Sequence, residues 1–523
     1  MPRLTGPQID AFFASVDDDD LRQSRYGIER ETLRVDRAGD LALTPHPQAL
    51  GSALTHPFIT TDFSEALLEF VTEAVSSPWE LVQFLCDLHS FTYAHIGHEM
   101  LWPLSMPCTV ERDDAVPLAR YGTSNVGKMK TVYRRGLGYR YGRTMQTIAG
   151  VHFNFSPAPG FWRRLAAARE DTRAEADFQS AAYFGLVRNF RRYAWLVLYL
   201  FGASPAVCRS FLEGREHALQ LFDSDTLYLP NATSLRMSDL GYSSAAQAKL
   251  NISLNSLDEY VAGLTRAIQT PYAPYADIGV EVDGQWRQLS ANILQIANEY
   301  YSVVRPKRVT RSGEKPTSAL RDRGVEYVEI RALDLSPFDP VGVSQTQVRL
   351  MECFLLLCAV CDCDVISSAE QVDMDFNQLE VATRGRAPQL MLRDAGVSRS
   401  LRDWGLSVFD DLETIAVRLD RACAGTEYAD AVARYRALIE DSSLTPSAQV
   451  LDSMRDQRAS HAHFGTQLAQ QHKDYFLGLA PLQKERAVSL RSVAARSLAR
   501  QSQIEKADTQ NFADYLRDYF SQD

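Results

Sequence analysis

Two acidic residues, Glu29 and Glu31, stand one residue apart inside the apolar run 26–35. If this run is a β-strand, its side chains alternate between two faces, and both carboxylates share a face with Leu33 and Val35. A buried carboxylate that lacks a partner costs several kcal/mol, so this face requires a neutralising group. The spacing therefore predicts bound cations beside the strand.

A similar pattern occurs far downstream, in the run 325–333. Read as a strand, it places Tyr327, Glu329 and Arg331 on one face together with apolar neighbours. An arginine held beside a carboxylate in this way can grip phosphate while the carboxylate binds a metal ion.

Further candidate ligands lie between these two runs. In a strand over 66–72, Glu69 points into an apolar face, and Asp62 precedes it in a polar turn. His152 shares a strand face with Asn154. A single histidine on a strand is usually structural, but its neighbourhood of carboxylates makes it a candidate ligand. Hard oxygen donors with one imidazole suit Mg²⁺ or Mn²⁺ rather than a thiolate-bound zinc.

Five converging carboxylates carry more charge than one divalent cation offsets, whereas two or three cations would balance them. Sites with several Mg²⁺ ions generally hold polyphosphates. Two basic runs, interpreted as loops, are candidates for the anion site: 305–311, which ends in Arg311, and 128–135, which contains Lys130 and Arg134. The alternative for either run is a solvated surface.

Several elements must position these residues. Apolar spacing predicts helices over 80–93, 175–200, 245–268 and 344–360, and strands over 28–35, 66–72, 148–155, 278–282 and 325–333. The order lacks steady βαβ alternation, which favours an α+β fold over a doubly wound sheet. Neither standard glycine-rich phosphate loop is present in the sequence. We expect a catalytic core over 1–375 and a mainly helical region over 376–523 that packs on it.

Composition narrows the functional class. The 523 residues carry a net charge of −11, which argues against a nucleic-acid binder or a binder of anionic membranes. The sequence shows no secretory signal and no apolar run of the roughly 18–20 residues that span a bilayer. We expect a reduced, cytoplasmic enzyme that acts on small molecules as a monomer or weak oligomer.

The run Cys358, Cys361 and Cys363 has two alternative interpretations: packing in the core, or a thiol or metal site.

Eight ordered segments closely resemble bacterial glutamate–cysteine ligase, over roughly 20–345. They are 26–35, 51–56, 59–70, 100–108, 121–125, 203–206, 232–242 and 305–314. The resemblance implies an ATP-dependent ligase that joins the γ-carboxyl of L-glutamate to the amine of L-cysteine through γ-glutamyl phosphate. It also implies a core similar to that of glutamine synthetase, in which an antiparallel sheet curves into a funnel with metals at its base.

The resemblance assigns residues to roles. Its ligands for two or three Mg²⁺ ions, with Mn²⁺ as an alternative, match one set: Glu29, Glu31, Asp62, Glu69, His152 and Glu329. By analogy, Glu31, Asp62 and Glu69 hold one metal, and Glu29, His152 and Glu329 hold another. Arg331 matches the arginine that faces the phosphates. Glutamate-binding positions match Gln146, Asn154 and Arg236, and cysteine-binding positions match Phe63, Tyr242 and Tyr301.

One position departs from the pattern. Ala297 stands where relatives carry an acid, which removes a carboxylate near Tyr301. A non-catalytic nucleotide or amino-acid sensor on the same fold is the competing hypothesis. It predicts the loss of ligand carboxylates, yet all six metal positions are filled.

Overall fold

A central antiparallel sheet carries both acidic runs. The computed structural model describes residues 6–241, 246–247, 250–311 and 313–522. The sheet has the order β11-β12-β5-β1-β3-β2, and β4 pairs with β1. Its strands are β1 (Arg25–Val35), β2 (Ile59–Thr61), β3 (Leu67–Val71), β4 (Met100–Leu101), β5 (Val151–Ser156), β11 (Val304–Lys307) and β12 (Tyr327–Leu333). Every adjacent pair in it is antiparallel.

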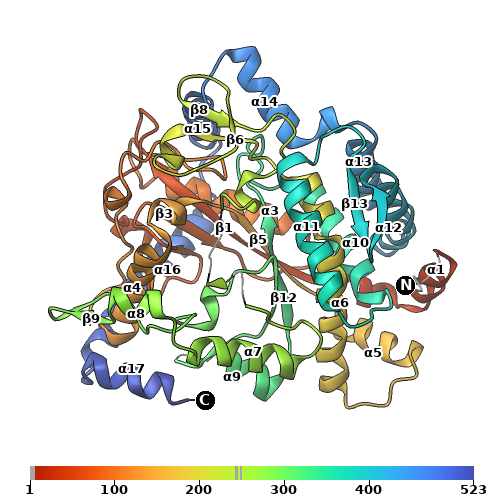
Figure 1. Cartoon of the computed structure of the whole chain (residues 1–523), viewed down its shortest axis with the longest axis horizontal. Helices are drawn as coiled ribbons and strands as arrows, with labels where there is room; N and C mark the ends of the chain where they lie inside the picture. The colour runs from red at the N-terminus through yellow and green to blue at the C-terminus, as the bar shows by residue number, and fades with distance from the viewer. Residues whose placement is uncertain (1–5, 242–245, 248–249, 312, 523) are drawn as a thin grey trace.

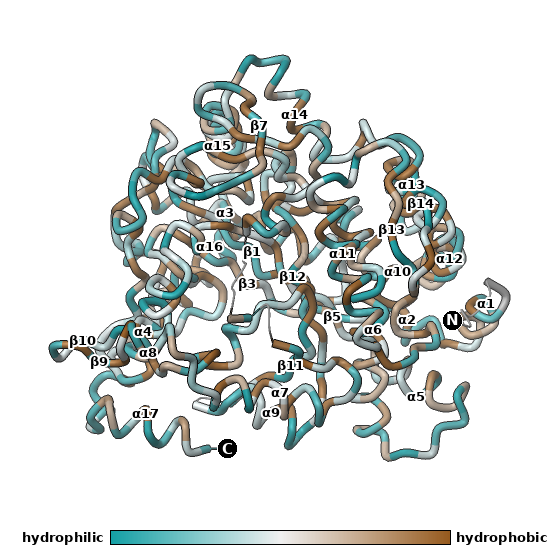
Figure 2. Tube along the Cα trace, in the orientation of Figure 1, coloured by the Kyte–Doolittle hydropathy of each residue, from teal (hydrophilic) through white to brown (hydrophobic). Residues whose placement is uncertain are grey.

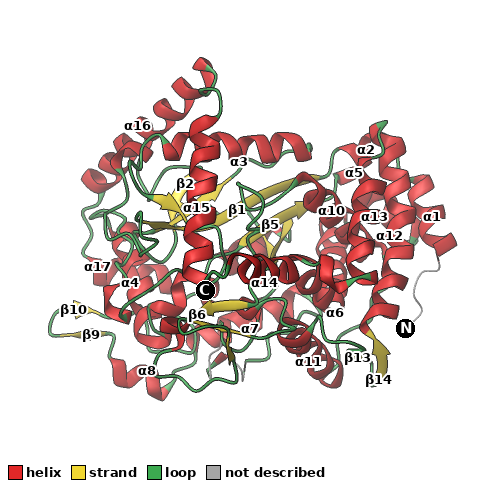
Figure 3. Cartoon of the chain, turned by 90° about the horizontal axis from the view of Figure 1, so that it is seen from above, coloured by secondary structure: helices red, strands yellow, loops and turns green. Residues whose placement is uncertain are grey.

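Helices surround this sheet, as Figures 1 and 3 show. They are α1 (Gly6–Ser15), α2 (Asp18–Arg22), α3 (Pro78–Tyr93), α4 (Asn125–Tyr141), α5 (Pro159–Ala168), α6 (Glu175–Phe201), α7 (Leu257–Gln269), α8 (Ala273–Ile278), α9 (Pro316–Arg323), α10 (Gln345–Val360), α11 (Ser368–Arg384), α12 (Leu401–Cys423), α13 (Glu427–Glu440), α14 (Pro446–Gln457), α15 (His461–Gly478), α16 (Lys484–Ala507) and α17 (Phe512–Phe520). The predicted α+β class is confirmed.

Three small sheets lie outside the central one. They are formed by β6 (Ala206–Cys208), β7 (Gln220–Leu221) and β8 (Thr226–Tyr228), by β9 (Glu281–Val282) with β10 (Gln285–Trp286), and by β13 (Met391–Asp394) with β14 (Val397–Ser400).

Strand β1 runs through the middle of the central sheet, and nearly all of it is buried. We call the side that carries Glu29 and Glu31 the front face, and the side that carries Arg30 and Arg34 the back face. On the back face, Ile28 lies opposite Phe153 of β5, and both belong to the main hydrophobic core. Helices α3 and α6 pack against β1 and β12 respectively. Figure 2 shows the hydrophobic stretch of β12 near the centre of the molecule.

Local sequence signals set the ends of the core helices. The Ser77 side chain caps α3 by accepting a hydrogen bond from the backbone N–H of Glu80, and Pro78 occupies the first turn. Ser344 caps α10 in the same way. The predicted helices over 80–93, 175–200 and 344–360 correspond to α3, α6 and α10 within a few residues.

Four local predictions were wrong. In the helix expected over 245–268, the described residues 250–256 are irregular and α7 begins at Leu257. The strand expected over 278–282 is the end of α8 followed by the short β9. The basic run 128–135 lies inside helix α4 rather than in a loop, and 305–307 belongs to β11. In each case the apolar or basic residues were identified correctly, but the run of residue types alone did not distinguish helix, strand and loop.

The C-terminal region is helical apart from the β13–β14 hairpin. The expected boundary at 375/376 falls inside α11, so the chain crosses it within one continuous helix. Helix α17 packs against α4, as Figure 1 shows. Among the described residues, we find no helix that has both the length and the apolar character of a membrane span.

The cysteine run divides between two environments. Cys358 and Cys361 are buried in the main core, which confirms core packing for these two. Cys363 is half-buried, and its sulfur accepts hydrogen bonds from Arg188 (3.2 Å) and Arg192 (2.8 Å). No group of potential metal ligands among the described residues includes any of the three.

Candidate active site

Four adjacent strands bring the predicted ligands together on the front face. Glu31 lies opposite Glu69 of β3, and Glu29 lies opposite His152 of β5. Farther along the sheet, Asn154 lies opposite Glu329 of β12. Side chains of directly opposed residues in an antiparallel pair share a face. Cross-strand register therefore assembles residues that are up to three hundred positions apart in the chain.

Three of these residues form a compact group of donors. Ligand atoms of Glu29, His152 and Glu329 all lie within 4.8 Å of one another. His152 Nδ1 is 3.0 Å from Glu29 Oε2, and its Nε2 is 3.8 Å from Glu31 Oε1. Asn154 donates a hydrogen bond of 3.0 Å to Glu29. This trio is the second of the two ligand groups that the resemblance implies.

Cations surround the Glu329 carboxylate. Lys307 Nζ lies 3.2 Å from Oε1, and Arg331 Nη1 lies 3.3 Å from Oε2. Burial raises the pKa of Glu329, but the charges of Lys307, Arg331, His152 and Arg305 more than offset it and hold that pKa well below its usual range. Glu329 is therefore a carboxylate at neutral pH. It stands where a metal ion and an anionic ligand could meet.

The opposite end of the acidic group is less well compensated, because the charge of Arg134 only partly offsets the effects that raise the pKa of Glu69. Burial, together with the charges of Glu29, Asp62 and Glu31, raises the pKa of Glu69 well above its usual value. Burial also raises the pKa of Glu31, although His152 opposes the shift. Within the described parts of the chain, we find no ion pair to the Glu69 carboxylate. A cation bound here would replace that missing partner.

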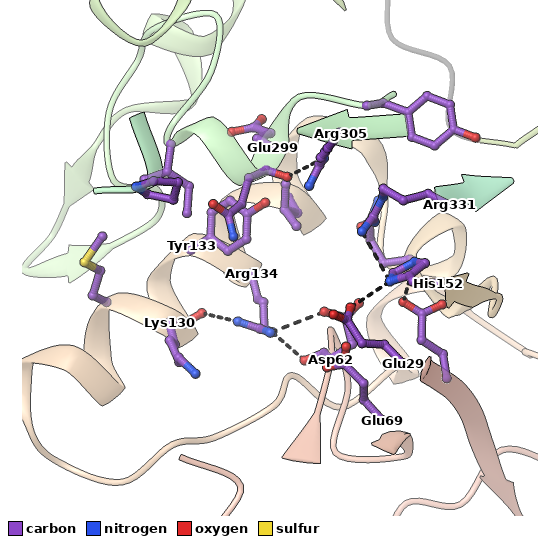
Figure 4. Close-up of a pocket in the computed structure, with 18 of the residues that line it drawn as sticks. Glu29, Asp62, Glu69, Lys130, Tyr133, Arg134, His152, Glu299, Arg305 and Arg331 are labelled. Carbon is purple, nitrogen blue, oxygen red and sulfur yellow. Dashed lines mark hydrogen bonds and ion pairs between the residues drawn. The ribbon is translucent and has the colours of Figure 1, made fainter. Parts of the chain in front are cut away.

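Helix α4 supplies a second basic group, facing Asp62. Arg134 Nη2 is 3.3 Å from Asp62 Oδ1, and its Nε donates to the backbone carbonyl of Asp62. Arg134 and Lys130 both lie over the ring of Tyr121, at 4.7 and 5.1 Å. Figure 4 shows Arg134 and Lys130 on one side of the acidic residues and Arg331 with His152 on the other.

These groups line one cavity of about 910 Å³. Of the predicted site residues, twelve lie on its wall: Glu29, Glu31, Asp62, Glu69, Lys130, Arg134, Gln146, His152, Tyr301, Arg311, Glu329 and Arg331. The volume is large enough for a nucleotide together with smaller molecules. Acidic residues occupy the middle of the wall, and basic residues flank them on both sides.

Four predicted contacts are not among these wall residues. Phe63 is 1% exposed and belongs to the main core. Asn154 is not on the wall, and its amide donates a hydrogen bond to Glu29. The Arg236 guanidinium is buried behind the wall, where it donates to the backbone carbonyl of Arg331 (2.9 Å) and pairs with Asp334 (3.6 Å). Tyr242 lies outside the described residues.

Sequence reasoning passed over several residues of the wall. Glu299 lies two positions after Ala297 and returns a carboxylate to this region, where it accepts hydrogen bonds from Tyr141 (2.7 Å) and Arg140 (2.8 Å). Its place in the run 294–299 was the available signal. Arg500, Ile504, Tyr515 and Tyr519 reach the cavity from α16 and α17. Their polar, helical surroundings gave no signal of a site.

Nearly the whole chain is similar in sequence to proteins that share one name. The model of the family described as "Glutamate-cysteine ligase" matches residues 9–381. Proteins named glutamate–cysteine ligase from Pseudomonas putida and Alcanivorax borkumensis are 49% and 50% identical over 94% and 95% of this chain, and over the same shares of their own lengths. The likeness thus continues well beyond residue 345.

Solved structures agree. A glutamate–cysteine ligase from Francisella tularensis, crystallised in complex with AMP, has a TM-score of 0.89 and 36% identity, covering 95% of this chain and 97% of its own. A bifunctional glutathione synthetase from Pasteurella multocida has a TM-score of 0.70 and 26% identity, with 88% of this chain and 53% of that chain covered.

Proposed function

This chain belongs to the glutamate–cysteine ligase family, and from this premise we propose how its cavity works. The enzyme joins the γ-carboxyl of L-glutamate to the amine of L-cysteine with ATP as cosubstrate, which is the first step of glutathione synthesis. The observation that carries the proposal is the juxtaposition of Glu29, His152 and Glu329 with Arg331 and Lys307 at one point of the cavity. That arrangement suits a metal-bound polyphosphate.

The donor set fits Mg²⁺. Carboxylates and one imidazole are hard or borderline ligands, and no thiol lies among them. Glu329 Oε2 is buried and accepts no hydrogen bond from the described residues, although it forms an ion pair with Arg331 Nη1 at 3.3 Å. This oxygen therefore keeps lone pairs that a metal ion could use. We assign Glu29, His152 and Glu329 to one ion, and Glu31, Asp62 and Glu69 to another. Bound Mg²⁺ would neutralise the carboxylates and the polyphosphate during phosphoryl transfer.

The chain's own cations would hold the phosphates. A free carboxylate is a poor electrophile because its leaving group would be oxide. Transfer of the γ-phosphoryl group of ATP to the glutamate side chain gives γ-glutamyl phosphate, which the amine of cysteine can attack. Arg331 and Lys307 lie where they would bind the transferring phosphoryl, with Arg311 at the rim. Their charge is fixed before substrate arrives, so little reorganisation is needed.

Other residues would position the two amino acids. Gln146 and Tyr301 line the cavity and are proposed to contact glutamate and cysteine respectively. Arg134 and Lys130 form the basic wall opposite Arg331 and would face an anionic group there. The Arg236 guanidinium donates a hydrogen bond to the backbone carbonyl of Arg331 in β12. Its proposed role is therefore to fix the position of Arg331, and a direct contact with the glutamate α-carboxylate would require it to turn into the cavity.

A product assay by mass tests this function. Purified enzyme is incubated with ATP, Mg²⁺, L-glutamate and a panel of amines that includes L-cysteine and ammonia, with and without excess chelator. We expect γ-glutamylcysteine, ADP and phosphate in equal amounts, dependent on both amino acids and abolished by chelation. Glutamine formed from ammonia, with no product from cysteine, would contradict the assignment.

A further inference from the structure

Directly behind the acidic site, the back face of β1 buries an arginine for which we find no partner in the described part of the chain. Arg30 is 1% exposed. Its Nε and Nη1 atoms are shielded from solvent and make no hydrogen bond, and none of the ion pairs among the described residues includes it. Arginine stays protonated in proteins. A buried guanidinium without a counter-charge costs several kcal/mol.

Two further unpartnered polar atoms lie on α3, the helix that packs against β1. Arg30 is directly opposite Phe70 on β3, and the His89 ring from α3 packs on Phe70 with centroids 4.6 Å apart. His89 is fully buried, and its Nε2 has no partner. Thr92, one helical turn farther along α3, is likewise fully buried, and its Oγ1 makes no hydrogen bond. We call the buried surroundings of the Arg30 guanidinium, on the side of His89 and α3, the Arg30 pocket.

Neighbouring elements close this pocket tightly. Phe476 of α15 stacks on the His89 ring at 5.2 Å. A Cβ atom added to Gly342, whose φ is +79°, would come within 3.1 Å of Arg30 Nε, so the backbone lies close against the guanidinium. Any occupant is therefore small.

Among the described residues, we find no carboxylate whose charge acts on Arg30. Burial lowers the pKa of His89 well below its usual value and that of His472 to about 4, so both are neutral at pH 7. Burial raises the pKa of the Tyr93 phenol, which is neutral as well. The buried Glu99 carboxylate is engaged by Arg34 at 2.5 Å and by Thr44. Glu352 of α10 accepts a hydrogen bond from Tyr428 at 2.7 Å.

We propose that the Arg30 pocket binds one small monovalent inorganic anion, such as chloride. A water molecule could satisfy hydrogen bonds there, but it would leave the guanidinium charge uncompensated. Arg30 stands between Glu29 and Glu31 in the chain, so an anion behind β1 would hold the strand that presents both carboxylates to the cavity.

The first test measures stability against chloride. The full-length protein is exchanged into sodium gluconate, and its melting temperature is followed as chloride replaces gluconate at constant ionic strength. We expect a saturable rise of several degrees. Arg30→Met should abolish the rise, whereas Arg25→Met, which removes an exposed arginine from the same strand, should keep it.

A second readout needs no variant and covers the case in which Arg30→Met fails to fold. Crystals of the wild-type protein grown with bromide in place of chloride are measured at the bromine absorption edge. The proposal requires an anomalous peak at hydrogen-bond distance, about 3.3 Å, from the Arg30 guanidinium. The absence of this peak, together with equal melting temperatures in chloride and gluconate, would overturn it in favour of water.

Discussion

The front face of β1 presents Glu29 and Glu31 to a cavity, whereas the back face buries Arg30 and Arg34 against helices. Within each face, one charge has a partner and another does not. Glu329 forms ion pairs with Lys307 and Arg331, while we find no ion pair to Glu69 among the described residues, where the charge of Arg134 acts on it only from nearby. Arg34 pairs with Glu99, while no described residue forms an ion pair with Arg30. In this protein, a buried charge that has an ion-pair partner contributes to the stability of the fold. A buried ionisable group that has no such partner marks a place where a ligand would bind.

The largest effect is expected from the front face. Glu329→Gln removes the charge that would bind metal but keeps the shape of the side chain. We expect kcat/KM to fall roughly 100- to 1,000-fold, while the far-UV circular dichroism spectrum stays unchanged. Glu326→Gln is the matched control, because Glu326 is exposed just before the same strand. Near-normal kinetics in Glu329→Gln would remove it from the site.

On the back face, Arg34→Met is expected to act on stability rather than on chemistry. It leaves the Glu99 carboxylate buried without its partner, which costs about 3–5 kcal/mol. Urea unfolding measures this loss. The double variant Arg34→Met/Glu99→Gln should recover part of it, because no unpaired charge is left behind. If the free energy of unfolding of the single variant falls by less than about 1 kcal/mol, the ion pair does not contribute to stability in the way proposed.

A buried acid on the same side predicts a pH effect. Burial raises the pKa of Glu352 to about 7, against an opposing hydrogen bond from Tyr428. The folded state therefore binds this proton more tightly than the unfolded state, whose pKa is about 4.3. The stabilising contribution of this proton to the free energy of unfolding, about 4 kcal/mol, is lost as the pH rises from about 4.3 through 7.

Glu352→Gln should remove this part of the pH dependence. Urea unfolding of the wild type and the variant at several pH values between 5 and 8.5 gives the two slopes. Equal slopes would show that Glu352 does not titrate in this range.

The smallest effect is expected at the surface. Arg163 and Glu175 lie 3.5 Å apart, and their side chains are 62% and 61% exposed. Solvent screens such pairs, so Arg163→Ala should change the free energy of unfolding by less than about 0.5 kcal/mol. A loss comparable to that of Arg34→Met would show that burial does not decide the value of an ion pair in this protein.

The sequence predicted the strands and the acidic residues well because both depend on period-two alternation. Glu29, Glu31, Glu69, His152 and Glu329 all lie where strand registers place them on one face. Alternation along a strand cannot reveal which strands become neighbours. The family resemblance supplied the full set of six candidate metal ligands. Strand alternation places Arg30 on the back face, but only the packing of α3 and α15 shows that no described residue forms an ion pair with it.

Other parts of the site were not predictable from local pattern. The run 128–135 was identified as basic, yet its helical geometry directs Arg134 and Lys130 toward Asp62, a contact fixed by tertiary packing. Tyr515 and Tyr519 come from a region whose composition resembles an ordinary polar helix. Phe63 was assigned to the cysteine pocket by resemblance, whereas its neighbours enclose it in the core.

The most direct test of the proposed metal site is the number of divalent cations that the front face binds. Equilibrium dialysis against Mn²⁺ is carried out with an unreactive ATP analogue and L-glutamate, for the wild type, Glu329→Gln and Glu326→Gln. We predict two or three Mn²⁺ per chain in the wild type and in Glu326→Gln, and fewer, more weakly bound ions in Glu329→Gln. Identical binding in all three proteins, or no Mn²⁺ beyond that carried by the nucleotide, would contradict the claim that these buried carboxylates form the metal site.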